Sequence, residues 1–429
     1  MIYTVQSGSP LHGTVLCPGD KSISHRYAML AAIAEGPSEL RNFAASADCR
    51  STLRCLSGLG IEIRTDGSTV RVSGQGLYGM KEPAAVLDAG NSGTTMRLLA
   101  GILAGCPFSS VIAGDESLAR RPMGRIIRPL SLMGARIRSG NDGLPPLSID
   151  GGDLQAIRYA LPVASAQVKS CVLLAGLFAR GVTAVEEKVP TRDHTEIALQ
   201  YLGATLRHDG NWIEVDPHPR LSGAQLEVPA DISGAAFFIV AAATVPGSEL
   251  LLPGIGLNAR RRALIEYLGS AGLRISVENE SESAGEARGD LLVRFDPSCL
   301  DKPLPPIGAG LAAALIDEIP VLSILGAQAG GLLVRDAGEL RVKECDRIAA
   351  IAANLRVMGA EVEEYPDGLA IRGGQRLQGA EIDSHGDHRI AMAFTVAGLA
   401  ASGETRVRRA ECADVSFPGF YEALSGAGS

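Results

Sequence analysis

A two-part block recurs six times along the 429-residue chain, and this repetition limits the folds that the chain can adopt. Each block opens with a helix of small apolar residues that follows a polar turn, as in GDKSISHRYAMLAAIAEG from Gly19. A second helix then closes on glycine and precedes a strand, as in LSGLGIEI around Gly60. In the sixth block this second part, FYEALSGAG, has no strand after it. The chain is therefore expected to be built from six related α/β units.

The length of the repeat indicates the kind of architecture. The closing glycines of the first five blocks lie 69 to 87 residues apart. Solenoid repeats run to about 20–50 residues, so an extended scaffold with a binding face is disfavoured. Each block can hold two helices and three or four strands. The sequence therefore predicts an α/β protein of two domains, each made of three blocks.

Composition narrows the function classes. The net charge is −8, which gives no general affinity for nucleic acid or anionic membranes. The eight cysteines form no CxxC pair, so they are typical of thiols in a reducing compartment. The sequence shows no signal peptide and no apolar run of the ~18 residues that a membrane span needs. We expect a soluble, cytoplasmic protein.

Domain boundaries follow from the missing last strand. The segment 3–17 could supply the strands that the sixth block lacks. The predicted domains are therefore 18–228 for the first three blocks, and 1–17 with 229–429 for the last three. The acidic and polar middle of the stretch 272–290 is predicted to be an exposed loop with little functional promise.

The polar residues at the predicted helix starts favour anion binding. Helix N-termini bind phosphates and carboxylates through free N–H groups and a partial positive charge. Lys21, Ser22 and Arg26 stand at the first such start, and a cation there is unfavourable unless an anion binds. The second start offers Asn91 and Gly93, and the third offers Ser165 and Gln167; these are weaker signals, and Ser165 is equally well an N-cap.

Further cations stand at the starts of the second helices and at the start of the first helix of the sixth block. Any one of them is more often a surface ion pair than part of a site. Their recurrence in successive blocks favours one surface that binds two anionic small molecules. Lys343 and Arg347 are also expected one helical turn apart. The residues of this cationic group are Lys21, Arg26, Arg121, Arg192, Lys343, Arg347 and Arg389.

Two carboxylates are candidates for proton transfer. Asp317 lies in the apolar stretch AALIDEIPVL, where an unpaired charge is costly, and Glu344 lies in RVKECDR. Neighbouring cations would keep both ionised, as a general base requires. Asp231, before the fourth block's first helix, is expected to be an N-cap.

The motifs PGDKSISHR, LDAGNSGTTMRLLAG, RRPMGR, SAQVKS, DEIPVL, RVKECDR and GDHRIAM follow one another between Pro18 and Met392. In this order they resemble the 5-enolpyruvylshikimate-3-phosphate (EPSP) synthase family, over essentially the whole chain. The resemblance implies two domains of three βαβαββ units each (an inside-out α/β barrel), with the active site in the cleft between them. It also implies transfer of the enolpyruvyl group of phosphoenolpyruvate to shikimate 3-phosphate, without metal or organic cofactor.

The resemblance assigns roles to residues of this chain. Asp317, Glu344 and Lys21 would carry the proton transfers. Shikimate 3-phosphate would be bound by Lys21, Ser22, Arg26, Ser165, Ala166, Gln167, Arg192, Asp317 and Lys343. Phosphoenolpyruvate would be bound by Lys21, Asn91, Gly93, Arg121, Gln167, Arg347 and Arg389.

The sequence departs from the family at one position and leaves two alternatives. Many members have a lysine where this chain has Val415, which puts one phosphoenolpyruvate contact in question. RRPMGR and TRDHTE resemble the family's second bacterial class, of which some members tolerate the inhibitor glyphosate through a side chain at the position of Gly93. The alternatives are the sister enolpyruvyl transferase acting on UDP-N-acetylglucosamine and a phosphometabolite-binding protein without activity. The first uses a loop cysteine that GDESLARRP lacks, and the second would lack the two carboxylates. The resemblance makes glyphosate an expected inhibitor and the protein an expected monomer.

Overall fold

The computed structural model describes residues 1–428, which divide into two compact units. Unit 1 comprises Met1–Pro18, Pro229–Ser281 and Ala287–Ser429, and unit 2 comprises Gly19–Val228 and Glu282–Glu286. Each unit has its own hydrophobic core. Residues 282–286 therefore belong with the first three blocks, although the sequence-based division places them with the last three.

Unit 2 contains three four-stranded sheets with one shared pairing pattern. In each sheet the first two strands are parallel, and the other two pairings are antiparallel. The first sheet takes its leading strand, β14, from the end of the unit. The sheets are β14 (Gln225–Glu227), β3 (Glu35–Arg41), β5 (Thr69–Gln75), β4 (Glu62–Asp66); β6 (Leu87–Asp88), β7 (Ser109–Ala113), β9 (Leu147–Asp150), β8 (Arg136–Ser139); and β10 (Arg158–Ala160), β11 (Thr183–Glu186), β13 (Trp212–Val215), β12 (Leu206–Asp209).

Unit 1 contains three further sheets, and the start of the chain contributes a strand to two of them. β1 pairs antiparallel with β22 in the sixth block, as the missing last strand predicts. β2 instead pairs parallel with β15 of the fourth block, so the N-terminal segment completes two blocks rather than one. The sheets are β16 (Arg274–Ser283), β17 (Glu286–Arg294), β15 (Glu249–Gly256), β2 (His12–Thr14); β18 (Gly331–Val334), β20 (Gly368–Arg372), β19 (Val362–Tyr365); and β1 (Ile2–Val5), β22 (Thr405–Arg408), β21 (Glu381–Asp383).

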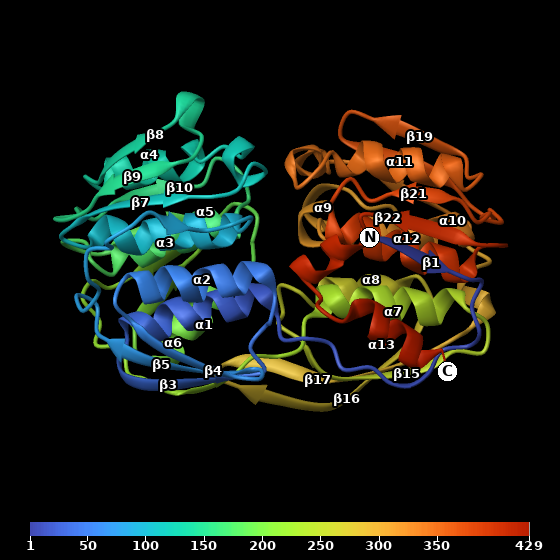
Figure 1. Ribbon diagram of the computed structural model, residues 1–429, viewed down its shortest axis with the longest axis horizontal. Coiled ribbons are helices and arrows are strands. Elements are labelled where there is room, and N and C mark those ends of the chain that lie inside the picture. The colour runs from blue at the N-terminus through green and yellow to red at the C-terminus, as the bar shows by residue number, and fades with distance from the viewer. Residues whose placement is uncertain (429) are drawn as a thin grey trace. The chain divides into compact units, whose positions relative to one another are not determined.

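The six predicted apolar helices are confirmed, and they form the interior of the two units. Beyond their first one or two turns they are apolar on all sides, and a helix of that kind is stable only when it is buried. Within each unit the sheets lie outside these helices (Figure 1). Among residues 1–428, no helix combines the length and apolar character needed to cross a bilayer. The six helices are α1 (Lys21–Ile33), α3 (Gly93–Gly105), α5 (Ala166–Gly176), α7 (Ile232–Thr244), α10 (Ile319–Gln328) and α12 (His388–Ala400).

In each of the first five blocks, the second helix ends two residues before the glycine that the repeat predicts. Glycine has no Cβ and adopts the left-handed backbone conformation that closes a helix at little cost. The five glycines, 60, 134, 203, 272 and 359, all have φ between +84° and +110°. The second helices are α2 (Ala47–Gly58), α4 (Gly124–Leu132), α6 (His194–Tyr201), α8 (Ala263–Ser270), α11 (Arg347–Val357) and α13 (Phe420–Ala427). The shorter helices are α9 (Ala309–Ala314), η1 (Leu118–Arg120), η2 (Asn141–Gly143), η3 (Pro297–Cys299), η4 (Gly338–Val342) and η5 (Ala410–Val415).

The prediction of an exposed loop in the middle of 272–290 is wrong about the loop, because these residues form strands. This stretch forms most of the hairpin of β16 and β17, and the exposed acidic side chains belong to β16. A ribbon whose faces are largely open to solvent tolerates such polar residues in strands, which explains the misleading composition. At the tip, Ala284 and Glu286 are buried.

Candidate active site

The start of α1 brings together three of the predicted binding residues. Asp20 caps the helix by accepting from the Ile23 N–H at 2.9 Å, and Lys21 is the first helical residue. A lysine at this position opposes the helix dipole. It is held by a charged hydrogen bond of 3.0 Å from Nζ to Asp48 Oδ2. The positive charge of Lys21 is therefore stabilised at the helix start by the carboxylate of Asp48.

Arg26 lies one turn further along α1 and is almost fully buried. Its Nε donates to Thr195 Oγ1 at 2.7 Å and one Nη donates to Ser170 Oγ at 3.1 Å. Burial, together with the nearby charge of Arg192, lowers the Arg26 pKa to about 10. Arg192 donates to Ser22 Oγ at 3.4 Å. Arg26, Arg192 and Ser22 therefore form one cluster, in which the two guanidinium groups repel each other.

The starts of α3 and α5 hold the next group. Ser92 caps α3, and Gly93 is its first residue. Arg121, which follows η1, donates to Asn91 Oδ1 at 2.7 Å, so two predicted phosphoenolpyruvate ligands are in contact. Ser165 caps α5 by accepting from the Val168 N–H at 3.4 Å, which confirms the N-cap reading of this serine, and Ala166 starts the helix.

Arg97 also belongs to this group, although the sequence analysis gave it no role. Its Nη1 donates to Gln167 Oε1 at 2.7 Å, and Gln167 in turn donates to Thr94 Oγ1 at 2.9 Å. A Cβ on Gly93 would stand 2.8 Å from Arg97 Nη1. Arg97 lies in the motif LDAGNSGTTMRLLAG, one helical turn after Gly93. This spacing is the sequence signal that points to Arg97.

In unit 1, Arg347 is the first residue of α11 and sits among three carboxylates. Its Nε donates to Asp387 Oδ2 at 2.7 Å, and Nη2 donates to Glu344 Oε2 at 2.7 Å. Its Nη1 lies 3.5 Å from Asp317 Oδ1, and Arg389 Nε lies 3.6 Å from the same oxygen. The structure thus brings together the side chains of Asp317, Glu344, Arg347 and Arg389.

Burial and charge act against each other in this cluster. Burial alone would lower the Arg347 pKa, but the carboxylates of Asp387, Glu344 and Asp317 raise it above its ordinary value. Burial would raise the pKa of Asp387, but Arg347 lowers it. Asp387 also caps α12 by accepting from the Arg389 N–H at 2.8 Å, a structural role that the sequence analysis did not assign.

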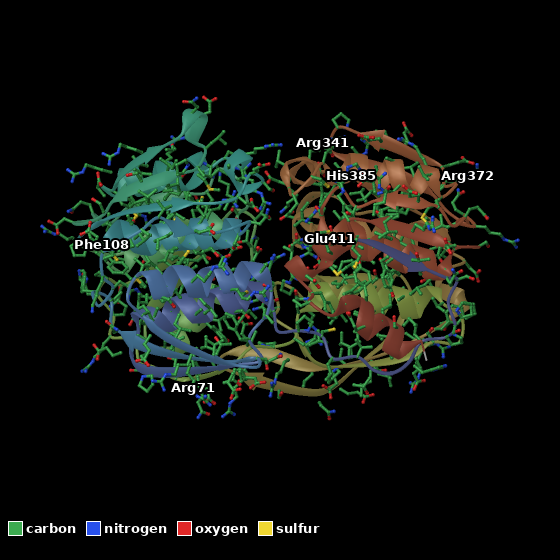
Figure 2. All side chains as sticks on the ribbon, in the orientation of Figure 1. Arg71, Phe108, Arg341, Arg372, His385 and Glu411 are labelled. Carbon is green, nitrogen blue, oxygen red and sulfur yellow. The ribbon has the colours of Figure 1, made fainter. Side chains whose placement is uncertain are left out.

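The burial of Arg347 separates it from ordinary surface ion pairs. Arg71 and Arg372, labelled in Figure 2, pair with Glu39 and Glu361 while more than half of each arginine side chain is exposed. Such pairs contribute little to stability. The Arg347 side chain is 1% exposed. A guanidinium group buried that deeply needs its carboxylate partners to stay charged.

Three further predictions have clear outcomes. Asp231 caps α7 by accepting from the Ser233 N–H at 2.9 Å, as expected. The expected one-turn spacing of Lys343 and Arg347 is wrong, because η4 ends at Val342 and α11 begins only at Arg347. Asp346 caps α11 between them and breaks any continuous helix. Val415, the position at which the sequence departs from the family's expected lysine, is the last residue of η5.

The fold is that of enolpyruvyl transferases. The solved enolpyruvyl transferase NikO from Streptomyces tendae, only 18% identical in sequence, superposes with a TM-score of 0.79 over 100% of this chain and 97% of that chain. At this identity the likeness establishes the fold alone.

The comparisons in sequence define the family. A model of the EPSP synthase (3-phosphoshikimate 1-carboxyvinyltransferase) family matches residues 5–424. A 3-phosphoshikimate 1-carboxyvinyltransferase of Solibacter usitatus is 53% identical over 98% of both chains, and one of Pelotomaculum thermopropionicum is 53% identical over 97% of this chain and 96% of that one. A solved EPSP synthase of Acinetobacter baumannii is 42% identical, with a TM-score of 0.88 over 100% of this chain and 98% of that chain. The chain belongs to the EPSP synthase family and is a transferase of the shikimate pathway.

Proposed function

We propose that this enzyme moves the enolpyruvyl group of phosphoenolpyruvate to the 5-hydroxyl of shikimate 3-phosphate with the residues described above. Shikimate 3-phosphate is assigned to Lys21, Ser22, Arg26, Ser165, Ala166, Gln167, Arg192, Asp317 and Lys343. Phosphoenolpyruvate is assigned to Lys21, Asn91, Gly93, Arg121, Gln167, Arg347 and Arg389. Both units contribute residues to these sets.

The reaction needs two proton transfers, and each has a candidate carboxylate. Asp317 accepts the proton of the 5-hydroxyl as its oxygen bonds to the central carbon of the enolpyruvyl group. Glu344 must take up a proton once the two anionic substrates are bound, and it donates this proton to the methylene carbon, which completes a tetrahedral adduct. Glu344 then takes a proton back from the resulting methyl group as the C–O bond to phosphate breaks. Lys21 neutralises the charge of the departing phosphate.

The observation that carries this assignment is the placement of Asp317 Oδ1 at 3.5 Å from Arg347 and 3.6 Å from Arg389. Two guanidinium groups at this distance favour the ionised carboxylate, which is the form that a general base must have. The same guanidinium groups match the carboxylate and phosphate of phosphoenolpyruvate, because planar guanidinium binds such oxygens in pairs. One cluster thus serves binding and proton transfer.

A mixing assay tests the function directly. The purified full-length protein is given both substrates, and released phosphate and the mass of the product are followed. Phosphate must appear only when both substrates are present. UDP-N-acetylglucosamine in place of shikimate 3-phosphate is the matched test of the sister activity. Phosphate release with that acceptor, and none with shikimate 3-phosphate, would overturn the proposal.

Three further properties are proposed from the same reasoning. Glyphosate should inhibit, because Gly93 leaves room beside the guanidinium groups of Arg97 and Arg121. The enzyme is placed in the cytoplasm, and the eight free cysteines among residues 1–428 support a reducing compartment. It is proposed to act as a monomer, because each unit buries its own core.

A further inference from the structure

The tip of the β16–β17 hairpin, residues 282–286, belongs to unit 2, whereas the strands behind it run in unit 1. The tip is fitted closely against α6. A Cβ on Gly285 would stand 2.7 Å from Ile197 Cγ2, and Gly285 itself has φ +80°. Ala284 packs into the unit 2 core. Only glycine fits at position 285, because a side chain there would push the tip away from Ile197 of α6.

Glu286 makes the polar contact of this tip. It is completely buried, and its Oε1 lies 2.7 Å from Nδ1 of His194, which is also buried. His194 is the first residue of α6 and follows Arg192 by two positions. Glu286 therefore acts on Arg192, which is assigned to shikimate 3-phosphate, through the backbone of His194.

The segment that carries Arg192 is also held from its other side. Thr191 donates to Glu187 Oε1, and Lys169 Nζ binds Glu187 Oε2 at 2.8 Å. Lys169 is 1% exposed and pairs also with Glu196 Oε1 at 2.9 Å. A buried ion-pair network of this kind is costly to break and fixes geometry. With Thr191 and His194 both anchored, Arg192 has little backbone freedom.

We propose that Glu286 is a positioning residue for the phosphate of shikimate 3-phosphate. Through His194 it fixes the start of α6 and thereby the guanidinium group of Arg192. A binding group that is held in place before the ligand arrives loses less entropy when the ligand binds. This inference rests on the proposed assignment of Arg192. It gives the hairpin, whose composition suggested no function, a part in substrate binding.

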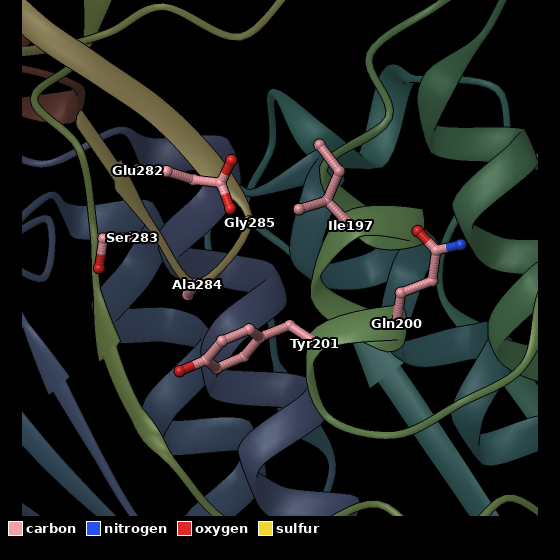
Figure 3. Close-up of a pocket in the computed structure, with 7 residues that line it drawn as sticks. All are labelled: Ile197, Gln200, Tyr201, Glu282, Ser283, Ala284 and Gly285. Carbon is pink, nitrogen blue, oxygen red and sulfur yellow. The ribbon is translucent and has the colours of Figure 1, made fainter. Parts of the chain in front are cut away.

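The other acidic residue of the tip offers a matched control. Glu282 lines an open pocket of about 570 Å³ together with Ser283, Ala284 and Gly285 of the tip (Figure 3). The opposite wall is formed by Ile197, Gln200 and Tyr201 of α6. Glu282 is exposed, so removing its carboxylate leaves the contact between Glu286 and His194 intact.

The first test compares Glu286→Ala with Glu282→Ala in the full-length enzyme. Calorimetric titration with shikimate 3-phosphate should show affinity reduced by about tenfold for Glu286→Ala and unchanged for Glu282→Ala. Glu286→Gln keeps an oxygen that accepts from Nδ1–H and should recover most of the affinity. KM for shikimate 3-phosphate should rise while kcat stays within about twofold, because only binding is affected. If Glu286→Ala fails to fold, Glu286→Asp, which shortens the reach by one methylene, takes its place.

A double-mutant cycle shows whether Glu286 acts through Arg192. In the Arg192→Ala background, Glu286→Ala should cause no further loss of affinity. Unchanged affinity of the single Glu286 variant, or losses that simply add, would overturn the positioning role. Unchanged affinity of Arg192→Ala alone would instead overturn the assignment of Arg192 in the proposed function. The two failures are therefore distinguished by which single variant binds normally.

Discussion

Asp317 is the residue that we propose as the base for the 5-hydroxyl. Its carboxylate is 15% exposed and faces the guanidinium groups of Arg347 and Arg389, at 3.5 and 3.6 Å. Its neighbour Glu318 is buried, and Arg261 Nη2 lies 3.1 Å from its Oε1. The cost of a charge in the apolar stretch AALIDEIPVL thus applies more to Glu318 than to Asp317. The accessible carboxylate of the pair is the one suited to proton transfer.

Replacing Asp317 by asparagine tests that role. The amide keeps the shape but does not accept the hydroxyl proton, so kcat should fall by roughly 10²–10⁴-fold. Affinity for shikimate 3-phosphate should change little in comparison. Asp301→Asn, at an exposed position, is the matched control and should retain full turnover. Near-normal kcat in the Asp317 variant would remove this residue from proton transfer.

Gly93 determines the space beside two guanidinium groups. Gly93→Ala would place a Cβ 2.8 Å from Arg97 Nη1 and 3.7 Å from Arg121 Nη1. The Arg97 terminus is flexible and can move, so the protein should fold. Inhibition by glyphosate should then be weaker by up to about tenfold. KM for phosphoenolpyruvate should rise, because a charge-assisted contact is displaced. Gly124→Ala, which meets no atom within 4 Å, is the control for inhibition assays. Equal inhibition of both variants would contradict this reading of Gly93.

His25 makes a prediction for the pH dependence of stability. It is fully buried, with Nδ1 2.6 Å from Thr52 Oγ1, and burial lowers its pKa from 6.5 to about 3. Between pH 3 and pH 6.5, His25 therefore binds a proton in the unfolded chain but not in the folded protein. The contribution of His25 to the free energy of unfolding is complete above about pH 6.5 and is lost as the pH falls toward 3. By pH 5 the loss amounts to about 2 kcal/mol.

Chemical denaturation at several pH values measures that loss. His25→Gln removes the titrating group, so its free energy of unfolding should depend less steeply on pH between 7 and 5 than that of the parent. The exposed His208 offers the matched substitution, His208→Gln, which should keep the parent slope. Identical slopes in all three proteins would show that His25 protonates freely in the folded state.

At the level of the elements, alanine should have opposite effects on stability at a glycine that follows a helix and at a glycine inside a helix. Gly359 ends α11 with φ +87°, and Gly269 lies inside α8; a Cβ on either would meet nothing within 4 Å. Gly359→Ala should lower the free energy of unfolding by about 1–2 kcal/mol, since alanine is strained in the left-handed conformation. Gly269→Ala should raise it by about 0.4–1 kcal/mol, because alanine restricts the unfolded chain. Thermal unfolding of the two variants must give shifts of opposite sign, and equal shifts would contradict the backbone argument.

The elements that the sequence predicts well are those whose signal is local. The six apolar helices follow from an all-round apolar composition, and their starts follow from capping residues such as Asp20 and Asp231. The left-handed glycines follow from the repeat itself. Arg347 and Arg389 were likewise found because each stands at a repeated helix start.

Features that depend on distant partners were not predictable in this way. The composition of 272–290 does not reveal that Glu286 meets His194, 92 positions earlier. Asp387 was visible in GDHR, but its contact with Arg347 requires two helix starts to meet in space. Similarly, the pairing of β2 with β15 joins segments more than 200 residues apart. Local periodicity carries no information about such contacts.

At the scale of the whole molecule, the two units hold different parts of the machinery. Arg192, assigned to the phosphate of shikimate 3-phosphate, belongs to unit 2 with Ser22 and Arg26. Arg347 and Arg389, assigned to phosphoenolpyruvate, belong to unit 1. The same repeat has therefore supplied cations for two anions in two separately folded cores. Substitutions of Arg192 and Arg389 should accordingly affect different ligands.

Arg192→Ala and Arg389→Ala test this division. Losing one charge-assisted contact should cost about 1.5–3 kcal/mol, or roughly 10- to 150-fold in affinity. Arg192→Ala should weaken shikimate 3-phosphate in the binary complex. Arg389→Ala should leave that complex nearly unchanged and weaken phosphoenolpyruvate when both ligands are present. Calorimetric titration of both variants measures the two affinities separately. If both variants lose the same ligand to the same extent, the assignment of the two arginines to different anions is wrong, because a shared ligand would then require both charges at once.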